Sequence, residues 1–143
     1  MDVLGYAPDH PRRVEALRHF QDLLVDDDAK GFYFQPCFSV VWDTAIAAYA
    51  LAEVAESPAG VEVGPALTRC ADWLLTKECR RRGDWAVKRP NLEPSGWYFE
   101  FANEFYPDID DTAMVLIGLE KARATNITAQ QATHRRAVNW LLG

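Results

Sequence analysis

The sequence contains an internal repeat, and this repeat constrains the fold more than any other feature. Three pairs of segments match in the same order along the chain: GFYFQ (31–35) with GWYFE (96–100), WDTAIAAYAL (42–51) with DDTAMVLIGL (110–119), and RCADWLL (69–75) with RAVNWLL (136–142). The unit therefore recurs about every 65 to 68 residues. Self-similarity at a fixed period is typical of an array in which each unit buries its apolar face against the next.

Each copy contains two segments with helical periodicity but different character. Residues 42–56 and 111–122 are apolar on nearly every side, whereas residues 64–82 and 128–142 are apolar mainly on one side. A helix that is apolar all round is buried, and an amphipathic helix covers a core. The order inner, outer, inner, outer predicts an all-α fold that forms a section of an α/α barrel, or toroid.

This pattern predicts a single partial-barrel domain over residues 1–143. Two helix-pair repeats, at about 31–80 and 96–142, are preceded by an amphipathic helix over residues 11–28. A length of 143 residues suffices for one domain with a substantial core, or for one piece of a larger protein. One apolar side is expected to require a neighbour, either the remainder of a larger protein or a second copy of the chain.

Charge and composition disfavour several partners. The formal net charge is −6, and Lys and Arg do not cluster with aromatic residues along any face, so nucleic acid is not expected. No apolar run reaches the length of a membrane-spanning helix, and the N-terminal residues lack the pattern of a secretory signal. Cys37, Cys70 and Cys79 have no metal-ligand spacing, which favours reduced thiols in a soluble cytoplasmic chain.

The stretch YPDIDDTAM (106–114) places Asp108, Asp110 and Asp111 directly before an apolar helix. In the repeat, Asp111 overlays Asp43, so both copies share this carboxylate. That position predicts a helix N-cap or a first-turn carboxylate, which accepts from unpaired backbone N–H groups and faces the positive end of the helix dipole, and the N-cap is favoured. Asp108 and Asp110 have no acidic counterpart in the first copy, so they are additions that the architecture does not require.

The acids have no basic neighbour in the sequence, since no Lys or Arg occurs between Arg89 and Lys121. Carboxylates held close together beside apolar surface cannot all ionise cheaply, so one of them is predicted to keep its proton and act as a donor. Two other interpretations stay open: the acids point into solvent, or they bind Mg²⁺ or Ca²⁺. Metal-dependent phosphate chemistry would need Lys or Arg nearby.

Aromatic residues crowd the approach to the acids. They are Trp85, Trp97, Tyr98, Phe99, Phe101, Phe105 and Tyr106, with Phe32, Tyr33, Phe34 and Trp42 in the matching part of the first copy. Most of these rings are expected to pack between helices. An apolar chamber lined by rings, with an acid at one end, also suits the protonation of an alkene, because the rings stabilise the carbocations that follow.

Three segments together resemble the squalene–hopene cyclases, which are class II triterpene cyclases: QPCFSVVWDTA (35–45), GDWAVKRPNLEPSGWYFEF (83–101) and YPDIDDTA (106–113). The resemblance implies a terpenoid cyclase-like α/α barrel and an isomerase that converts squalene to hopene or hopanol by protonation-initiated polycyclisation. It implies no metal and no other cofactor. It also implies a peripheral, monotopic enzyme on the cytoplasmic side of a membrane, with that surface and squalene or a related polyprene as partners.

The resemblance also implies roles for individual residues. Asp110 would protonate the terminal double bond, and the other two acids would complete a hydrogen-bonded carboxylate network. Ser39 falls where the family places a hydroxyl in that network. Trp42 falls where the family places a ring that lines the chamber, and Phe99 where it places a ring over a developing cation.

The sequence departs from the family pattern in an aromatic repeat that runs Leu, Gln, Gly, Trp. This repeat corresponds to Leu75, Cys79, Gly83 and Trp85, with Cys79 at the position where Gln is usual. If such repeats clamp helices together, this clamp is expected to be weak.

Length is a second departure, because family members are several times longer and use a His from elsewhere in the chain to hold the acidic Asp. His10, His19 and His134 do not lie in a matching context. The chain is therefore expected to be a cyclase fragment with negligible turnover alone.

Two other functions stay open. The chain could be a non-catalytic helical scaffold that associates with itself through its exposed apolar side. An inverting glycosidase on an α/α barrel would need two carboxylates roughly 6.5–9.5 Å apart. Acids one or two residues apart in an apolar setting fit that mechanism poorly.

Overall fold

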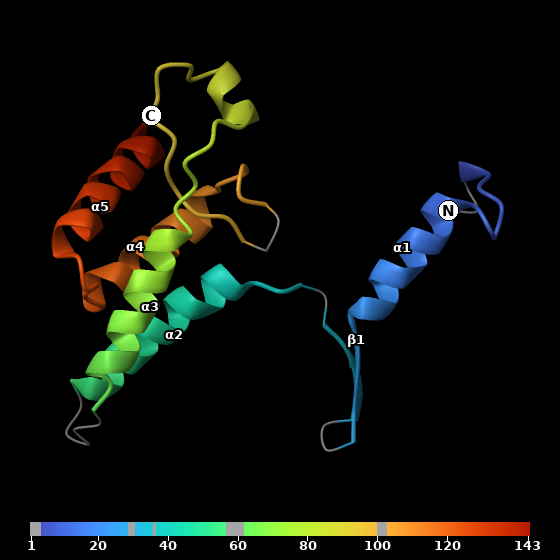
Figure 1. Ribbon diagram of the computed structural model, residues 1–143, viewed down its shortest axis with the longest axis horizontal. Coiled ribbons are helices and arrows are strands. Elements are labelled where there is room, and N and C mark those ends of the chain that lie inside the picture. Colours follow the sequence, from blue (N-terminus) through green and yellow to red (C-terminus); the bar gives the residue numbers. More distant parts are fainter. Residues whose placement is uncertain (1–3, 29–30, 36, 57–61, 100–102) are drawn as a thin grey trace. The chain divides into compact units, whose positions relative to one another are not determined.

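The computed structural model describes residues 4–28, 31–35, 37–56, 62–99 and 103–143. The chain divides into two compact units, Met1–Phe38 and Ser39–Gly143, where the sequence predicted one domain. The boundary separates residues 31–35 of the first repeat from the helices that follow them. Figure 1 shows the elements of each unit. Residues 100 and 101, at the end of the GWYFEF segment, lie outside the described residues.

The first unit contains one helix and a β-hairpin. Helix α1 (Pro11–Asp22) begins after His10, whose Nδ1 accepts from the Arg12 N–H at 3.2 Å. Strand β1 (Leu24–Asp27) pairs antiparallel with β2 (Gly31–Phe34), with Leu24 opposite Phe34. The prediction of a helix through residue 28 is therefore wrong at its end. The aromatic segment 32–34 favours a strand and offers residues 24–27 a partner, which overrides their helical periodicity.

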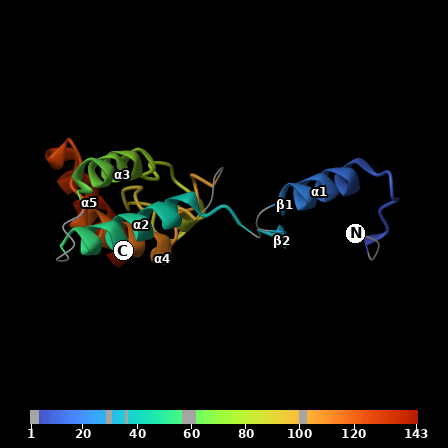
Figure 2. The same ribbon diagram turned by 90° about the horizontal axis from the view of Figure 1, so that it is seen from below.

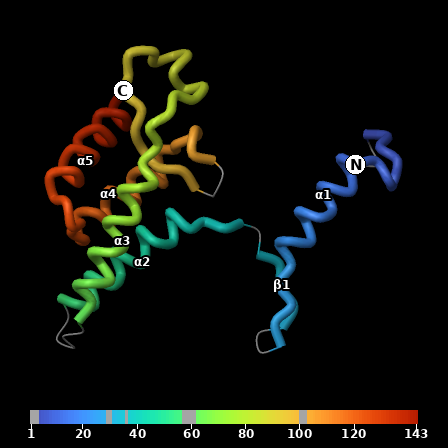
Figure 3. The backbone as a smooth tube through the Cα atoms, in the orientation of Figure 1, coloured from blue at the N-terminus to red at the C-terminus, as the bar shows by residue number. Residues whose placement is uncertain are grey.

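The described residues of the second unit form four α-helices: α2 (Val40–Ala55), α3 (Gly64–Thr76), α4 (Ile109–Lys121) and α5 (Ile127–Leu142). A short 3-10 helix, η2 (Asp84–Val87), lies in the long connection between α3 and α4. The tube in Figure 3 follows this connection from the end of α3 to the start of α4. Helix α3 ends at Thr76, earlier than the predicted residue 82.

The helices pack in the predicted order of inner and outer pairs. The inner helices α2 and α4 pack against each other, α3 packs on α2, and α5 packs on α4. Figure 2 shows these helices from a second direction. Their core includes Val41, Ala45, Leu74, Val115 and Leu119. Helix α4 has buried residues over most of its length, whereas α3 and α5 each bury two. The prediction that a helix with apolar residues on nearly every side is the inner one is therefore confirmed for α4.

Gly118 allows the two inner helices to approach closely. A Cβ at Gly118 would lie 2.9 Å from the backbone carbonyl oxygen of Ala45. Farther along the same helices, Lys121 pairs with Glu53 at 2.8 Å. The later residue of α4, Lys121, contacts the later residue of α2, Glu53, so the two helices run in the same general direction. Their N-terminal ends therefore lie at the same end of the pair.

We expect Gly118→Ala to destabilise the second unit by about 1–3 kcal/mol, because the new methyl group meets backbone that cannot move aside. At a helix position without this contact, the same change stabilises by about 1 kcal/mol. The sign of the change in unfolding free energy, measured by urea titration, is therefore decisive. Glu120→Ala, on the exposed side of α4, is the control and should change stability by less than about 0.5 kcal/mol. A stabilising Gly118→Ala would contradict the close packing.

Candidate active site

Asp108 is the N-cap of α4. Its backbone is extended, and its Oδ1 accepts from the Asp111 N–H at 2.8 Å. Asp108, and not Asp111, is therefore the cap, and Asp111 takes the other position that the sequence predicts for it, inside the first turn of α4. Asp43 likewise lies inside the first turn of α2, where its carboxylate accepts from the Ser39 hydroxyl at 3.0 Å.

Asp111 is the buried acid of the cluster. It is 2% exposed, and its Oδ1 has no hydrogen-bond partner among the described residues. Burial raises the pKa of Asp111 to about 7, with further contributions from a side-chain hydrogen bond to Asp108 and from the negative charges of Asp108 and Asp110. Near neutral pH this carboxyl group therefore retains a proton for a substantial part of the time.

Asp110 is exposed and lies at an open groove of about 510 Å³. The groove is lined mainly by apolar and aromatic side chains, together with Asp108, Asp110, Asp84 and Arg89. Asp111 is not part of its lining. The three acids thus occupy three different environments: Asp108 is bound at a helix terminus, Asp111 is buried, and Asp110 faces the groove.

Arg89 was not predicted to lie near the acids, because it is distant from them in sequence. The connection between α3 and α4 folds back so that Arg89 lines the same groove as Asp108 and Asp110. Its Nε donates to the carbonyl oxygen of Gly143. The absence of Lys and Arg from residues 90–120 therefore does not mean that the site lacks a cation.

The other predicted site residues lie at the acid end of the inner helices but are not joined to the acids by any described contact. Ser39 donates to Asp43 and not to the acid cluster. Trp42 lies half-buried in the first turn of α2, and Phe99 lies half-buried in the chain that follows Trp97. Their predicted roles against a substrate remain proposals.

Trp97 and Thr112 hold the start of α4 in place, whereas the sequence pointed to Trp97 only as one of several rings near the acids and assigned no role to Thr112. The Trp97 N–H donates to the Thr112 hydroxyl at 2.9 Å, and the Trp97 carbonyl accepts from the Asp108 N–H at 3.0 Å. Trp97 and Thr112 are both fully buried. The Asp-Thr pair that both repeats share could have drawn attention to Thr112. It does not indicate that the Thr112 hydroxyl binds the backbone of Trp97.

In the part of the chain that the structure describes, no group of three or more His, Cys, Asp or Glu side chains is arranged to hold a metal ion. The three acids therefore do not converge as ligands of a divalent cation would. None of the described helices combines the length and apolar character needed to cross a bilayer.

The paired inner and outer helices, with an acid cluster at the start of one inner helix, define the class of α/α-barrel terpenoid cyclases. The family profile described as squalene-hopene cyclase C-terminal domain matches residues 38–143. The chain belongs to this squalene–hopene cyclase family.

Individual relatives are similar over almost the whole chain. The squalene–hopene cyclase of Bradyrhizobium diazoefficiens is 40% identical over 99% of this chain, and that of Zymomonas mobilis is 37% identical over 99%. The squalene–hopene cyclase of Alicyclobacillus acidocaldarius is 37% identical over 94%. The matched part covers only 21%, 22% and 21% of these three relatives, respectively. The chain therefore spans about a fifth of the length of the curated relatives that it matches.

The raised pKa of Asp111 makes a prediction about stability. An acid whose pKa is higher in the folded than in the unfolded state binds its proton more tightly when folded. Its contribution to stability is therefore greatest below its ordinary pKa of 3.8 and falls as the pH rises through about 7. We therefore expect the stability of Asp111→Asn relative to wild type to be higher at pH 8 than at pH 5.5, because wild type loses stability between these pH values and the neutral Asn does not.

Urea unfolding at the two pH values measures this difference. Glu120→Gln is the control, because Glu120 is exposed near the other end of α4, and it should not reproduce this difference. If Asp111→Asn loses the same stability at pH 5.5 and pH 8, Asp111 does not carry a raised pKa.

Proposed function

We propose that this chain supplies the proton-donating wall of a squalene–hopene cyclase-type reaction. The observation that carries the proposal is the acid cluster at the start of α4, in which burial and like charge favour a protonated carboxyl group near neutral pH. The substrate is squalene or a related polyprene, and the reaction is an isomerisation that begins with protonation of its terminal double bond.

The three acid environments support a division of roles. Asp108 is engaged with the backbone of α4, and Asp111 is buried beneath the surface. Asp108 and Asp110 both line the groove, but Asp110 is exposed and does not form the cap, so it is the acid more accessible to a substrate. Asp110 is therefore our proposed donor. Asp108 and Asp111 keep a proton within the network and orient it.

In the proposed reaction, the Asp110 proton forms a new C–H bond as the π bond of the terminal alkene breaks. The tertiary carbocation that results is attacked by the next double bond, and successive ring closures move the charge along the chain. Loss of a proton gives hopene, and capture of water gives hopanol. Asp110 becomes a carboxylate and must regain a proton from its network. Rings such as Trp42 and Phe99 would stabilise the cations through their π faces.

The rest of the chamber would come from a larger cyclase, since the chain spans about a fifth of the length of its relatives. On this proposal the isolated chain has negligible turnover. Because squalene partitions into lipid, the complete enzyme would work as a peripheral, monotopic protein at the cytoplasmic side of a membrane. No metal or cofactor takes part in the proposed chemistry.

A graft tests the proposed function. Residues 38–143 replace the matching segment of the Alicyclobacillus acidocaldarius squalene–hopene cyclase, and the products formed from squalene are measured by gas chromatography and mass spectrometry. We expect the graft to cyclise squalene and Asp110→Asn in the graft to lower the rate by at least about 10²-fold, as for loss of a general acid.

Glu120→Gln is the control for this graft, because Glu120 is an exposed carboxylate on the same helix. It should leave the rate unchanged. Full activity in the Asp110→Asn graft would remove Asp110 from the role of donor. A folded graft with no cyclisation would show that the segment does not supply a working acid site.

A second candidate function is a non-catalytic scaffold that associates with itself, and the exposed face of α2 favours it. Ile46 and Tyr49 are 39% and 38% exposed, although they lie on a helix that is apolar on nearly every side. If this face pairs with a second copy, the chain should dimerise at micromolar concentration and Ile46→Glu should restore the monomer. Sedimentation equilibrium distinguishes the two states. A monomer over a wide concentration range would exclude this function.

A further inference from the structure

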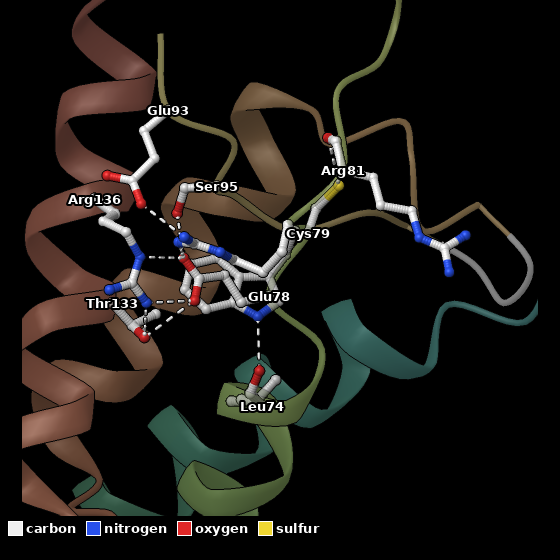
Figure 4. Close-up of polar contacts among 10 residues, drawn as sticks. Leu74, Glu78, Cys79, Arg81, Glu93, Ser95, Thr133 and Arg136 are labelled. Atoms are coloured by element: carbon white, nitrogen blue, oxygen red, sulfur yellow. Dashed lines mark hydrogen bonds and ion pairs between the residues drawn. The ribbon is translucent and has the colours of Figure 1, made fainter.

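Glu78 has a dense set of polar contacts at the start of the connection between α3 and α4. Its side chain is only 6% exposed. Its two carboxylate oxygens accept from the Ser95 hydroxyl at 2.7 Å, the Thr133 hydroxyl at 3.2 Å, and Arg136 at 3.0 Å and 2.7 Å. Arg80 adds an ion pair at 3.1 Å. Figure 4 shows Glu78 between Ser95 on one side and Thr133 and Arg136 of α5 on the other.

These contacts keep Glu78 ionised in a buried position. Burial alone would raise the pKa of Glu78, but hydrogen bonds from Arg136, Ser95 and Arg80 outweigh it and hold the pKa below its usual value. A buried carboxylate with this many donors has a fixed geometry, because moving it would leave several charged or polar groups unpaired. Glu78 is therefore a rigid point between α5 and Ser95.

The clamp expected at Cys79 is thus made one residue earlier. Glu78 carries the hydrogen bonds to α5, whereas the thiol of Cys79 contacts the carbonyl oxygen of Glu104. The backbone of Cys79 does contribute, because its N–H donates to the Gly96 carbonyl at 2.8 Å. The sequence suggested a weak clamp because Cys79 stands where Gln is usual. It did not indicate that the neighbouring carboxylate of Glu78 binds α5 instead.

Residues 95–97 connect Glu78 to the acid cluster, and we refer to them as the strap. Ser95 is fully buried and donates to Glu78. Trp97 is anchored at its ring, where Nε1 donates to the Leu74 carbonyl at 2.8 Å. Its backbone then makes the two bonds to Asp108 and Thr112 that hold the start of α4. The path from α5 to the acids therefore runs through Glu78 and the strap.

The strap has little room for adjustment. Gly96 has a φ of +94°, and a Cβ there would lie 2.8 Å from the Thr112 hydroxyl and 3.1 Å from the ring of Trp140. Backbone packed this closely transmits a displacement to its neighbours and does not absorb it. A change at the Glu78 end of the strap should therefore reach Asp108 and Asp111.

We propose that Glu78 is a positioning residue for the acid cluster: by holding Ser95, it fixes the strap against the start of α4 and so keeps Asp111 buried beside Asp108. The catalytic meaning of this role rests on the proposed function. The positioning itself does not, and it can be tested without any turnover. Nothing in this role requires Glu78 to contact a substrate.

The test measures the titration of the Asp111 carboxyl group in the complete 143-residue chain by carbon-13 NMR, with the signal assigned through Asp111→Asn. We expect Glu78→Ala to lower the Asp111 midpoint by at least about one pH unit, because a loosened strap admits water to the buried carboxyl group. Glu78→Gln retains an oxygen that can accept from Ser95. Its midpoint should therefore lie closer to that of wild type, even though the ion pair with Arg136 is lost.

Asp72→Ala is the matched control. Asp72 joins α3 to the chain before α5 by accepting from the Thr125 N–H and hydroxyl, both at 2.7 Å, but it does not touch the strap. It should lower stability while leaving the Asp111 midpoint in place. An unchanged midpoint in folded Glu78→Ala would overturn the proposal and leave Glu78 as a structural clamp only.

Ser95→Ala keeps the test decisive if Glu78→Ala does not fold. This smaller change leaves the contacts of Glu78 with α5 intact and removes only its bond to the strap. We expect the Asp111 midpoint to fall here as well, and an unchanged midpoint in Ser95→Ala would overturn the proposal. A shifted midpoint together with an inactive graft would support the positioning role and reject the proposed function, so the two failures are distinguishable.

Discussion

The acid site depends on one short piece of backbone pairing, the two hydrogen bonds between Trp97 and the start of α4. Through these bonds Trp97 fixes Asp108 and Thr112, and Asp108 in turn binds the N–H of Asp111. A helix N-terminus presents unpaired donors that attract negative charge. Asp108 accepts from the Asp111 N–H, and the side chain of Asp111 is buried, which raises its pKa to about 7.

This arrangement separates two effects that a helix terminus usually combines. The cap favours an ionised carboxylate, because backbone N–H groups stabilise negative charge. Burial beside a like charge favours a protonated one. Asp108 forms the cap, and Asp111 beside it is the buried acid whose pKa is raised. Asp110, between them in sequence, is left at the groove where exchange with a substrate or with solvent can occur.

The sequence predicted the architecture well because apolar periodicity and the repeat both report on packing. It predicted the inner and outer helices, and the segment that carries the acids. The sequence did not predict features that depend on the positions of a few atoms, such as which residue caps a helix or which side chains meet across a loop. Whether Asp108 or Asp111 is the cap depends on a shift of three residues in the start of α4, and the connection made by Glu78 depends on where a long loop returns. The hairpin of β1 and β2 formed because strand pairing outweighed the helical pattern of residues 24–27.

The two copies of the repeat show why a shared motif gives only one acid site. Both copies have Asp followed by Thr in the first turn of an inner helix, and in both copies the upstream Gly adopts a positive φ, +81° at Gly31 and +94° at Gly96. Yet Thr44 donates to a carbonyl in its own helix, whereas Thr112 accepts from Trp97. The segment 31–34 instead pairs with β1. In the second copy the backbone of Trp97 binds the start of α4, and the shared Asp of that copy, Asp111, is buried and has a raised pKa.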